Sequence, residues 1–78
     1  MSSYKIVLSS VEDVRRFVAD IGKADCEVDL VSGRYTVDAK SIMGIFSLDL
    51  SKPIVLEAHD GGKGSVAGIV KPYLADGQ

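Results

Sequence analysis

Hydrophobic residues recur along this chain with two different periods, and the first part of it predicts a strand followed by a helix. Tyr4–Leu8 is short and rich in β-forming residues, which is typical of a strand. Over Val11–Ile21 the apolar residues fall at helical spacing, and Ser10 precedes them in the Ser-x-x-Asp pattern of a helix start. We expect this helix to end at Gly22, in the left-handed conformation that glycine adopts easily.

The middle of the chain shows the two-residue period of β-strands. Cys26–Val31 and Tyr35–Ala39 each alternate in polarity, and Ser32-Gly33 between them provides a turn, so two antiparallel strands are expected. Ile54–His59 predicts a fourth strand with alternate apolar positions on one face. Asp60–Gly64 is rich in glycine and predicts a flexible turn.

Two shorter helices complete the predicted order. The second opens at Ser41, with Ile45 and Leu48 facing inward. The third begins near Ser65 and should kink or stop at Pro72, because proline lacks the amide donor and clashes with the preceding turn. The order strand, helix, strand, strand, helix, strand, helix suits an α+β fold in which a four-stranded antiparallel sheet carries three helices on one face.

The length and net charge of the chain limit the classes of protein to which it can belong. With 78 residues, 46% of them hydrophobic and 26% charged, the chain has room for one domain over residues 1–78. The formal net charge is -2 and the charges are scattered, so neither a nucleic acid nor a membrane surface is an expected partner. The N-terminus lacks the features of a signal peptide and the apolar runs are short, so we expect a cytoplasmic protein.

The sequence offers no metal or cofactor site. Cys26 is the single cysteine, which excludes an internal disulfide and a multi-cysteine metal site, and we expect it to act as a small buried hydrophobic residue. No Ser/His/Asp arrangement, zinc spacing or complete phosphate loop is present. We therefore expect no catalytic residues and no enzymatic activity.

The segment Lys40–Leu48 carries the strongest functional signal. Ser41 stands at a helix start, where free amides and the helix dipole would favour a phosphate on its hydroxyl, with Lys40 alongside. A second apolar strip lies on the same helix, which does not need it for its own core: Ile42, Met43 and Phe46. The alternative explanations are that Ser41 is a plain N-cap and that the strip packs against the sheet.

This segment resembles the regulatory-serine region of HPr, the phosphocarrier of the bacterial sugar phosphotransferase system. In the Gram-positive form of HPr, Lys-Ser-Ile-Met-Gly is followed by a hydrophobic, Ser-Leu pattern, as in Lys40–Leu48. The resemblance implies the open-faced β-sandwich of that family, with the element order βαββαβα. The order predicted from the hydrophobic pattern agrees with it.

The histidine motif of that family is missing. HPr proteins carry phosphate on the histidine of a Gly-Leu/Ile-His-Ala-Arg-Pro motif at the start of the first helix. Here Ser10 falls near the histidine position, Glu12 near the arginine and Asp13 near the proline. The two carboxylates suit a helix start but would repel a phosphoryl group. The chain is thus similar to the catabolite-repression paralogue of HPr, a degenerate form that lacks the active histidine and keeps the regulatory serine.

This resemblance implies a regulatory or adaptor protein. Ser41 would be the target of a bifunctional serine kinase/phosphorylase, and the strip beside it, with Lys40, would dock protein partners. The implied partners are a catabolite-control repressor or other phosphotransferase-system proteins.

Two other hypotheses stay open. The chain would be a phosphocarrier if His59, its only histidine, or another group such as Ser9 or Ser10 accepted phosphate. His59 is expected on the sheet face opposite Leu56, where a solvated strand histidine is the simpler explanation, and capping is the simpler role for the two serines. The third hypothesis is a structural or small-ligand-binding α+β domain in which the serine segment serves packing alone.

Overall fold

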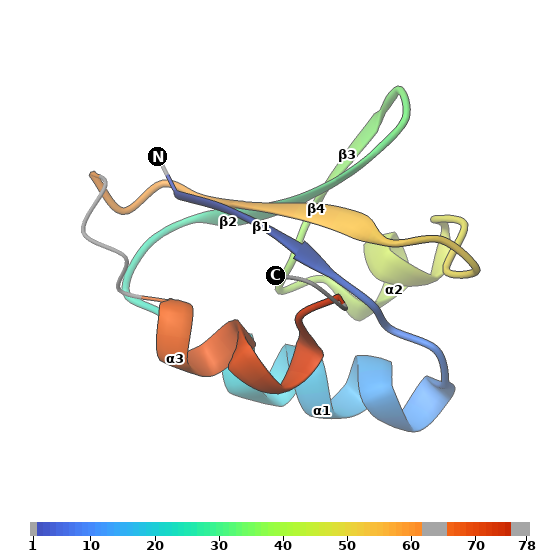
Figure 1. Cartoon of the computed structure of the whole chain (residues 1–78), viewed down its shortest axis with the longest axis horizontal. Coiled ribbons are helices and arrows are strands. Elements are labelled where there is room, and N and C mark those ends of the chain that lie inside the picture. Colours follow the sequence, from blue (N-terminus) through green and yellow to red (C-terminus); the bar gives the residue numbers. More distant parts are fainter. Residues whose placement is uncertain (1, 62–65, 76–78) are drawn as a thin grey trace.

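A computed structural model describes residues 2–61 and 66–75 of the chain (Figure 1). Its strands and helices follow the predicted order. In chain order they are β1 (Ser2–Ile6), α1 (Val11–Ile21), β2 (Val28–Ser32), β3 (Tyr35–Asp38), α2 (Ile42–Phe46), β4 (Ile54–Ala58), α3 (Ala67–Val70) and the 3₁₀ turn η1 (Lys71–Tyr73). No helix in these described ranges is long and apolar enough to cross a membrane.

The four strands form one antiparallel sheet in the order β1-β4-β2-β3. The register pairs Ile6 with Ile54, Leu30 with Leu56, and Leu30 with Val37 on the other side of β2. The helices lie on one face of this sheet and leave the other face bare (Figure 1). The predicted α+β fold, an open-faced β-sandwich with helices on one side, is confirmed.

The core lies between the sheet and the helices. Alternate residues of the strands point into it, as the two-residue period requires, and α1 contributes residues at three- and four-residue spacing. Phe17 packs edge-on against Tyr73, with ring centroids 5.3 Å apart and an interplanar angle of 86°. The largest fully buried side chains are Phe17, Ile6, Leu8, Ile21, Leu30, Ile45, Ile54, Leu56, Val14, Val28, Val66 and Val70.

The first strand begins and ends two residues earlier than predicted. After Ile6 the chain leaves β4 and meets the C-terminal segment: the Val7 amide donates to the Tyr73 carbonyl (2.8 Å), and the Ala75 amide donates to the Lys5 carbonyl (2.9 Å). These bonds cover part of the free edge of β1, which would otherwise expose unpaired backbone groups. Leu8 is still fully buried, although it lies beyond the strand.

Glycine has different roles at the predicted helix end and at the predicted hairpin turn. Gly22 follows α1 with a φ of -61°, so the predicted left-handed conformation is wrong; its amide donates to the Val18 carbonyl (3.0 Å) and simply completes the last turn. Gly33 has a φ of 59° and Arg34 a negative φ, the pattern of a two-residue hairpin turn that needs glycine first. Cys26 is partly buried against the core rather than enclosed by it.

The C-terminal helix stops near its proline. The α-helical geometry of α3 ends at Val70, and Lys71–Tyr73 continues as a 3₁₀ turn that includes Pro72. The predicted stop is therefore confirmed, and its cause is the missing proline amide. The predicted helix start at Ser65, and Gly62–Gly64 of the predicted turn, lie outside the described residues.

Candidate functional site

Ser41 is the N-cap of α2. Its hydroxyl accepts a hydrogen bond from the Gly44 amide (3.2 Å), and its carbonyl accepts one from the Ile45 amide (3.0 Å). The residue as a whole is half-buried, neither enclosed by the core nor fully exposed. Because α2 has only five residues, its macrodipole is small, and the amides of its first turn would provide most of the attraction for an anion.

The apolar residues of α2 divide between the core and the surface. Ile45 is fully buried and Leu48 is 7% exposed, which confirms that these two face inward. The structure places the second strip at the surface, where Ile42 is 36%, Met43 79% and Phe46 42% exposed. Core packing of Met43 and Phe46, the alternative explanation, does not fit these exposures.

Gly44 allows α2 to lie close to β3. A Cβ atom at this position would stand 3.2 Å from the Val37 Cβ and 3.3 Å from the Ser41 Oγ, closer than side chains normally approach. The glycine in the Ser-Ile-Met-Gly sequence therefore sets how closely the helix and its capping serine pack against the sheet.

Lys40 does not lie where a phosphate on Ser41 would need it. Its Nζ donates to the Ala24 carbonyl (3.0 Å), in the segment that joins α1 to β2. Lys40 is exposed, so this bond exchanges readily with water, but the ammonium would have to leave it in order to pair with a phosphate on Ser41. The sequence alone suggested a closer arrangement.

The polar groups at the start of α1 form hydrogen bonds with one another. The Ser10 hydroxyl accepts from the Asp13 amide (3.1 Å), while the Asp13 carboxylate accepts from the Ser9 hydroxyl (2.9 Å) and the Ser9 amide (3.2 Å). These contacts, the Ser9 hydroxyl first, lower the pKa of the Asp13 carboxyl. Ser10 thus caps the helix, and the Asp13 carboxylate binds back to Ser9, an arrangement similar to a capping box.

The arginines after this turn are held by acids of the same helix. Arg15 lies 3.9 Å from a Glu12 carboxylate oxygen and Arg16 lies 3.8 Å from one of Asp13. All four are surface side chains, so each pair contributes little to stability. The start of α1 therefore presents carboxylates with arginines already drawn toward them, a poor setting for a phosphoryl group.

His59 contacts a residue that the sequence pattern did not indicate. Its Nε2 lies 3.0 Å from the Asp29 carboxylate, on the neighbouring strand β2, and its amide donates to the Glu27 carbonyl (2.9 Å). Both side chains are about one third exposed. Within residues 2–61 and 66–75 no three His, Cys, Asp or Glu side chains form a group that could hold a metal ion.

The comparisons with known proteins agree with this architecture. No family model matches the sequence, and no match was found among curated proteins. Among solved structures, the chain is similar to the crystal structure of HPr-C-His from Thermoanaerobacter tengcongensis, with a TM-score of 0.78 and 25% sequence identity over 94% of this chain and 91% of that one. The chain has an HPr-like fold. The resemblance noted in Lys40–Leu48 therefore extends to the topology of nearly the whole chain.

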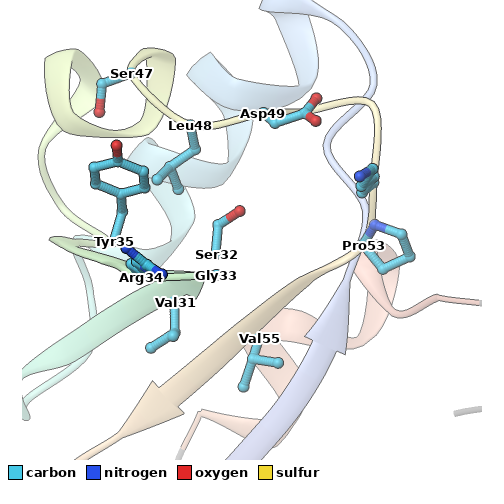
Figure 2. Close-up of a pocket in the computed structure, with 11 residues that line it drawn as sticks. Val31, Ser32, Gly33, Arg34, Tyr35, Ser47, Leu48, Asp49, Pro53 and Val55 are labelled. Carbon is cyan, nitrogen blue, oxygen red and sulfur yellow. The ribbon is translucent and has the colours of Figure 1, made fainter.

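A hollow beside the end of α2 was not predicted. It lies between the β2–β3 turn and the loop that joins α2 to β4, has a volume of about 580 Å³, and is drawn in Figure 2. Arg34 comes from the turn and Lys52 from the loop, 18 positions apart in the sequence. No local pattern brings two such loop residues together, so only the fold reveals the site.

Proposed function

We propose that this chain is a regulatory or adaptor protein related to the HPr phosphocarriers, acts without enzymatic activity of its own, and docks protein partners through α2. The observation that carries the proposal is the exposed strip of Ile42, Met43 and Phe46 beside a half-buried capping serine. Methionine and phenylalanine are enriched at protein interfaces relative to the rest of a protein surface. The Lys40–Leu48 resemblance and the HPr-like fold support the same function.

Ser41 is the proposed control point. A phosphate on its hydroxyl would add about -1.5 to -2 charges next to the strip, where it would recruit an arginine-bearing partner or repel an acidic one. The first-turn amides of α2 would stabilise it, and Lys40 would strengthen the binding on leaving the Ala24 carbonyl. The proposed modifying enzyme is a serine kinase/phosphorylase of the HPr type, and the proposed partner is a catabolite-control repressor or another phosphotransferase-system protein in the cytoplasm.

Phosphorylation is tested with ATP and an HPr serine kinase, followed by mass spectrometry to locate the phosphate. We expect one added phosphate on Ser41, none on the Ser41→Ala variant, and unchanged labelling of Ser47→Ala. Ser47 is the matched control because its hydroxyl lies at the other end of the same helix, where it donates to the Gly44 carbonyl (2.6 Å). Equal labelling of the Ser41→Ala variant would contradict the proposal.

Docking is tested by calorimetry with the repressor and the phosphorylated chain. The Met43→Ala change should weaken binding by at least about tenfold if Met43 is an anchor. Val11→Ala is the control, since Val11 is also an exposed apolar side chain (58%) but lies on α1. If both changes weaken binding equally, or neither does, the strip on α2 is not the docking surface.

The phosphocarrier alternative is tested with phosphoenolpyruvate and the first enzyme of the phosphotransferase system. An acid-labile phosphoryl adduct on this chain, lost in a His59→Gln variant, would replace the adaptor proposal. The hydrogen bonds that already engage the Ser9 and Ser10 hydroxyls, and the carboxylates of Glu12 and Asp13, support the expectation that none forms at the start of α1.

A further inference from the structure

The hollow between the β2–β3 turn and the α2–β4 loop exists because the sheet separates there. The β2–β4 ladder ends with the pair Val31 and Val55, although β2 continues to Ser32. From that point the hairpin diverges from β4 (Figure 1). The hollow opens in the gap, and its volume of about 580 Å³ lies within the range of small-molecule sites.

The walls combine apolar surface with polar groups. Val31, Val55 and Pro53 are the apolar residues of the lining that reach the surface, whereas Leu48, which also lines the hollow, is only 7% exposed. Figure 2 shows Arg34 and Tyr35 on the hairpin side and Asp49 and Pro53 on the loop side. A bound molecule would thus contact both apolar and polar side chains.

The charge of the lining is positive, although the whole chain is negative. Arg34 and Lys52 both line the hollow, and within the described part of the chain neither lies within 4.0 Å of a carboxylate oxygen. Asp49 is the one acid of the lining. Its carboxylate already accepts hydrogen bonds from the Ser51 hydroxyl and amide, and these bonds, with Lys52 contributing, lower its pKa. In a chain with a net charge of -2, this is a local excess of positive charge.

From these observations we propose that the hollow binds a small organic anion: one carboxylate or phosphate ester group on a compact apolar body. The guanidinium of Arg34 would bind the anionic group with two parallel hydrogen bonds, and Lys52 would add a point charge from the opposite wall. The apolar body would cover Val31, Val55 and Pro53. The proposal does not depend on Ser41 or on the docking strip.

The test is a two-dimensional amide NMR titration at constant ionic strength with two probes, benzoate and phenyl phosphate. Benzyl alcohol and inorganic phosphate are the controls, because the first lacks the charge and the second lacks the apolar body. For a ligand of about ten non-hydrogen atoms, ordinary affinity per atom gives a dissociation constant in the low millimolar range. We expect saturable shifts at residues 31–35 and 47–55 with at least one anionic probe, and weaker binding of both controls. Comparison of the two probes separates a carboxylate site from a phosphate site.

Variants then assign the binding to the two cations. Arg34→Gln and Lys52→Gln should each weaken binding severalfold, and the double variant by at least about tenfold, since both lose a direct charge contact. Arg15→Gln is the control, because Arg15 is also an exposed cation but lies on α1. The proposal is overturned if neither anion gives saturable shifts, or if either control binds as tightly as the anion that binds best. It is overturned as well if Arg15→Gln weakens binding as much as Arg34→Gln. It is also overturned if an acidic peptide binds there while both small anions fail, since the hollow would then serve a protein partner.

Discussion

The bond between Tyr73 and Asp20 joins η1 to the last turn of α1, and its removal tests how much this contact between helical segments stabilises the fold. The Tyr73 hydroxyl donates to the Asp20 carboxylate at 2.6 Å, so η1 is tied to α1. Tyr73→Phe removes only the hydroxyl and keeps the edge-on packing of the ring against Phe17. Tyr73 as a whole is 5% exposed, so the change is made at a nearly enclosed residue.

The magnitude follows from the type of bond. A hydrogen bond to a charged acceptor contributes about 1.5–3 kcal/mol, and the lower end applies here because Asp20 is half-buried and water would replace the lost donor. A loss of about 1.5 kcal/mol lowers the melting temperature of a domain of this size by roughly 6–12 °C. A shift that large is well above the error of thermal unfolding followed by circular dichroism.

The pH dependence provides the second half of the test. Burial first, and then the bond to Asp20, raises the pKa of Tyr73 to about 12 from an ordinary value of 10.0. Because the pKa of Tyr73 is higher in the folded state than in the unfolded state, its protonated hydroxyl contributes fully to the free energy of unfolding below pH 10. This contribution is lost as the pH rises toward 12. The stability difference between wild type and Tyr73→Phe should therefore shrink over that interval. A variant as stable as wild type at pH 7, or a difference that does not change at alkaline pH, would show that this bond does not hold the layer.

Two further predictions concern the helices. Gly44→Ala should lower the free energy of unfolding by about 1–3 kcal/mol, because its Cβ would crowd Val37; in contrast, Gly68→Ala, with nothing within 4 Å of its Cβ, should raise it by up to about 1 kcal/mol. Urea unfolding measures both, and equal effects would exclude the close approach of α2 to β3 as the cause. Asp13→Asn should reduce the loss of stability that occurs as the pH falls below about 4. The Ser9 hydroxyl lowers the pKa of the Asp13 carboxyl, so the carboxylate contributes stability above its ordinary pKa of 3.8, and this contribution is lost as the pH falls. The same decrease in the free energy of unfolding with falling pH in variant and wild type would contradict this prediction.

The sequence predicts features set by local pattern and misses those set by long-range geometry. Helical spacing in Val11–Ile21 and alternation in Tyr35–Asp38 are local, so these elements were predicted almost to the residue. The end of β1 at Ile6 depends on the C-terminal segment beside it, which no local signal indicates. The bond of Lys40 to the Ala24 carbonyl is of the same kind, since it depends on where the end of α1 comes to lie.

The features of the candidate site likewise divide into those that local sequence pattern predicts and those that depend on long-range geometry. Ser41 as a cap and Met43 as an exposed residue follow from helical spacing beside a serine. The pairing of His59 with Asp29 spans 30 positions and depends on β4 lying next to β2, and that adjacency is a property of topology. The hollow lies where the β2–β4 ladder ends, at the pair Val31 and Val55, and that position is also a property of topology.

The shortness of α2 determines what a charge at Ser41 would change. A helix of five residues is not stable alone, so α2 is held by the burial of Ile45 and by the approach of Gly44 to β3. Aspartate caps a helix about as well as serine, so Ser41→Asp should change the free energy of unfolding by less than about 0.5 kcal/mol. Ser47→Asp places the same charge at the unfavourable C-terminal end, and is the control for charge alone.

We therefore expect Ser41→Asp to alter partner affinity while the urea midpoint stays near that of wild type. A large fall in that midpoint would mean that aspartate does not replace the capping bond from the Gly44 amide to Ser41, and that this bond holds α2 in place. Phosphorylation would then act by releasing the helix, and the exposed strip around Met43 would be lost as a surface instead of being modified as one.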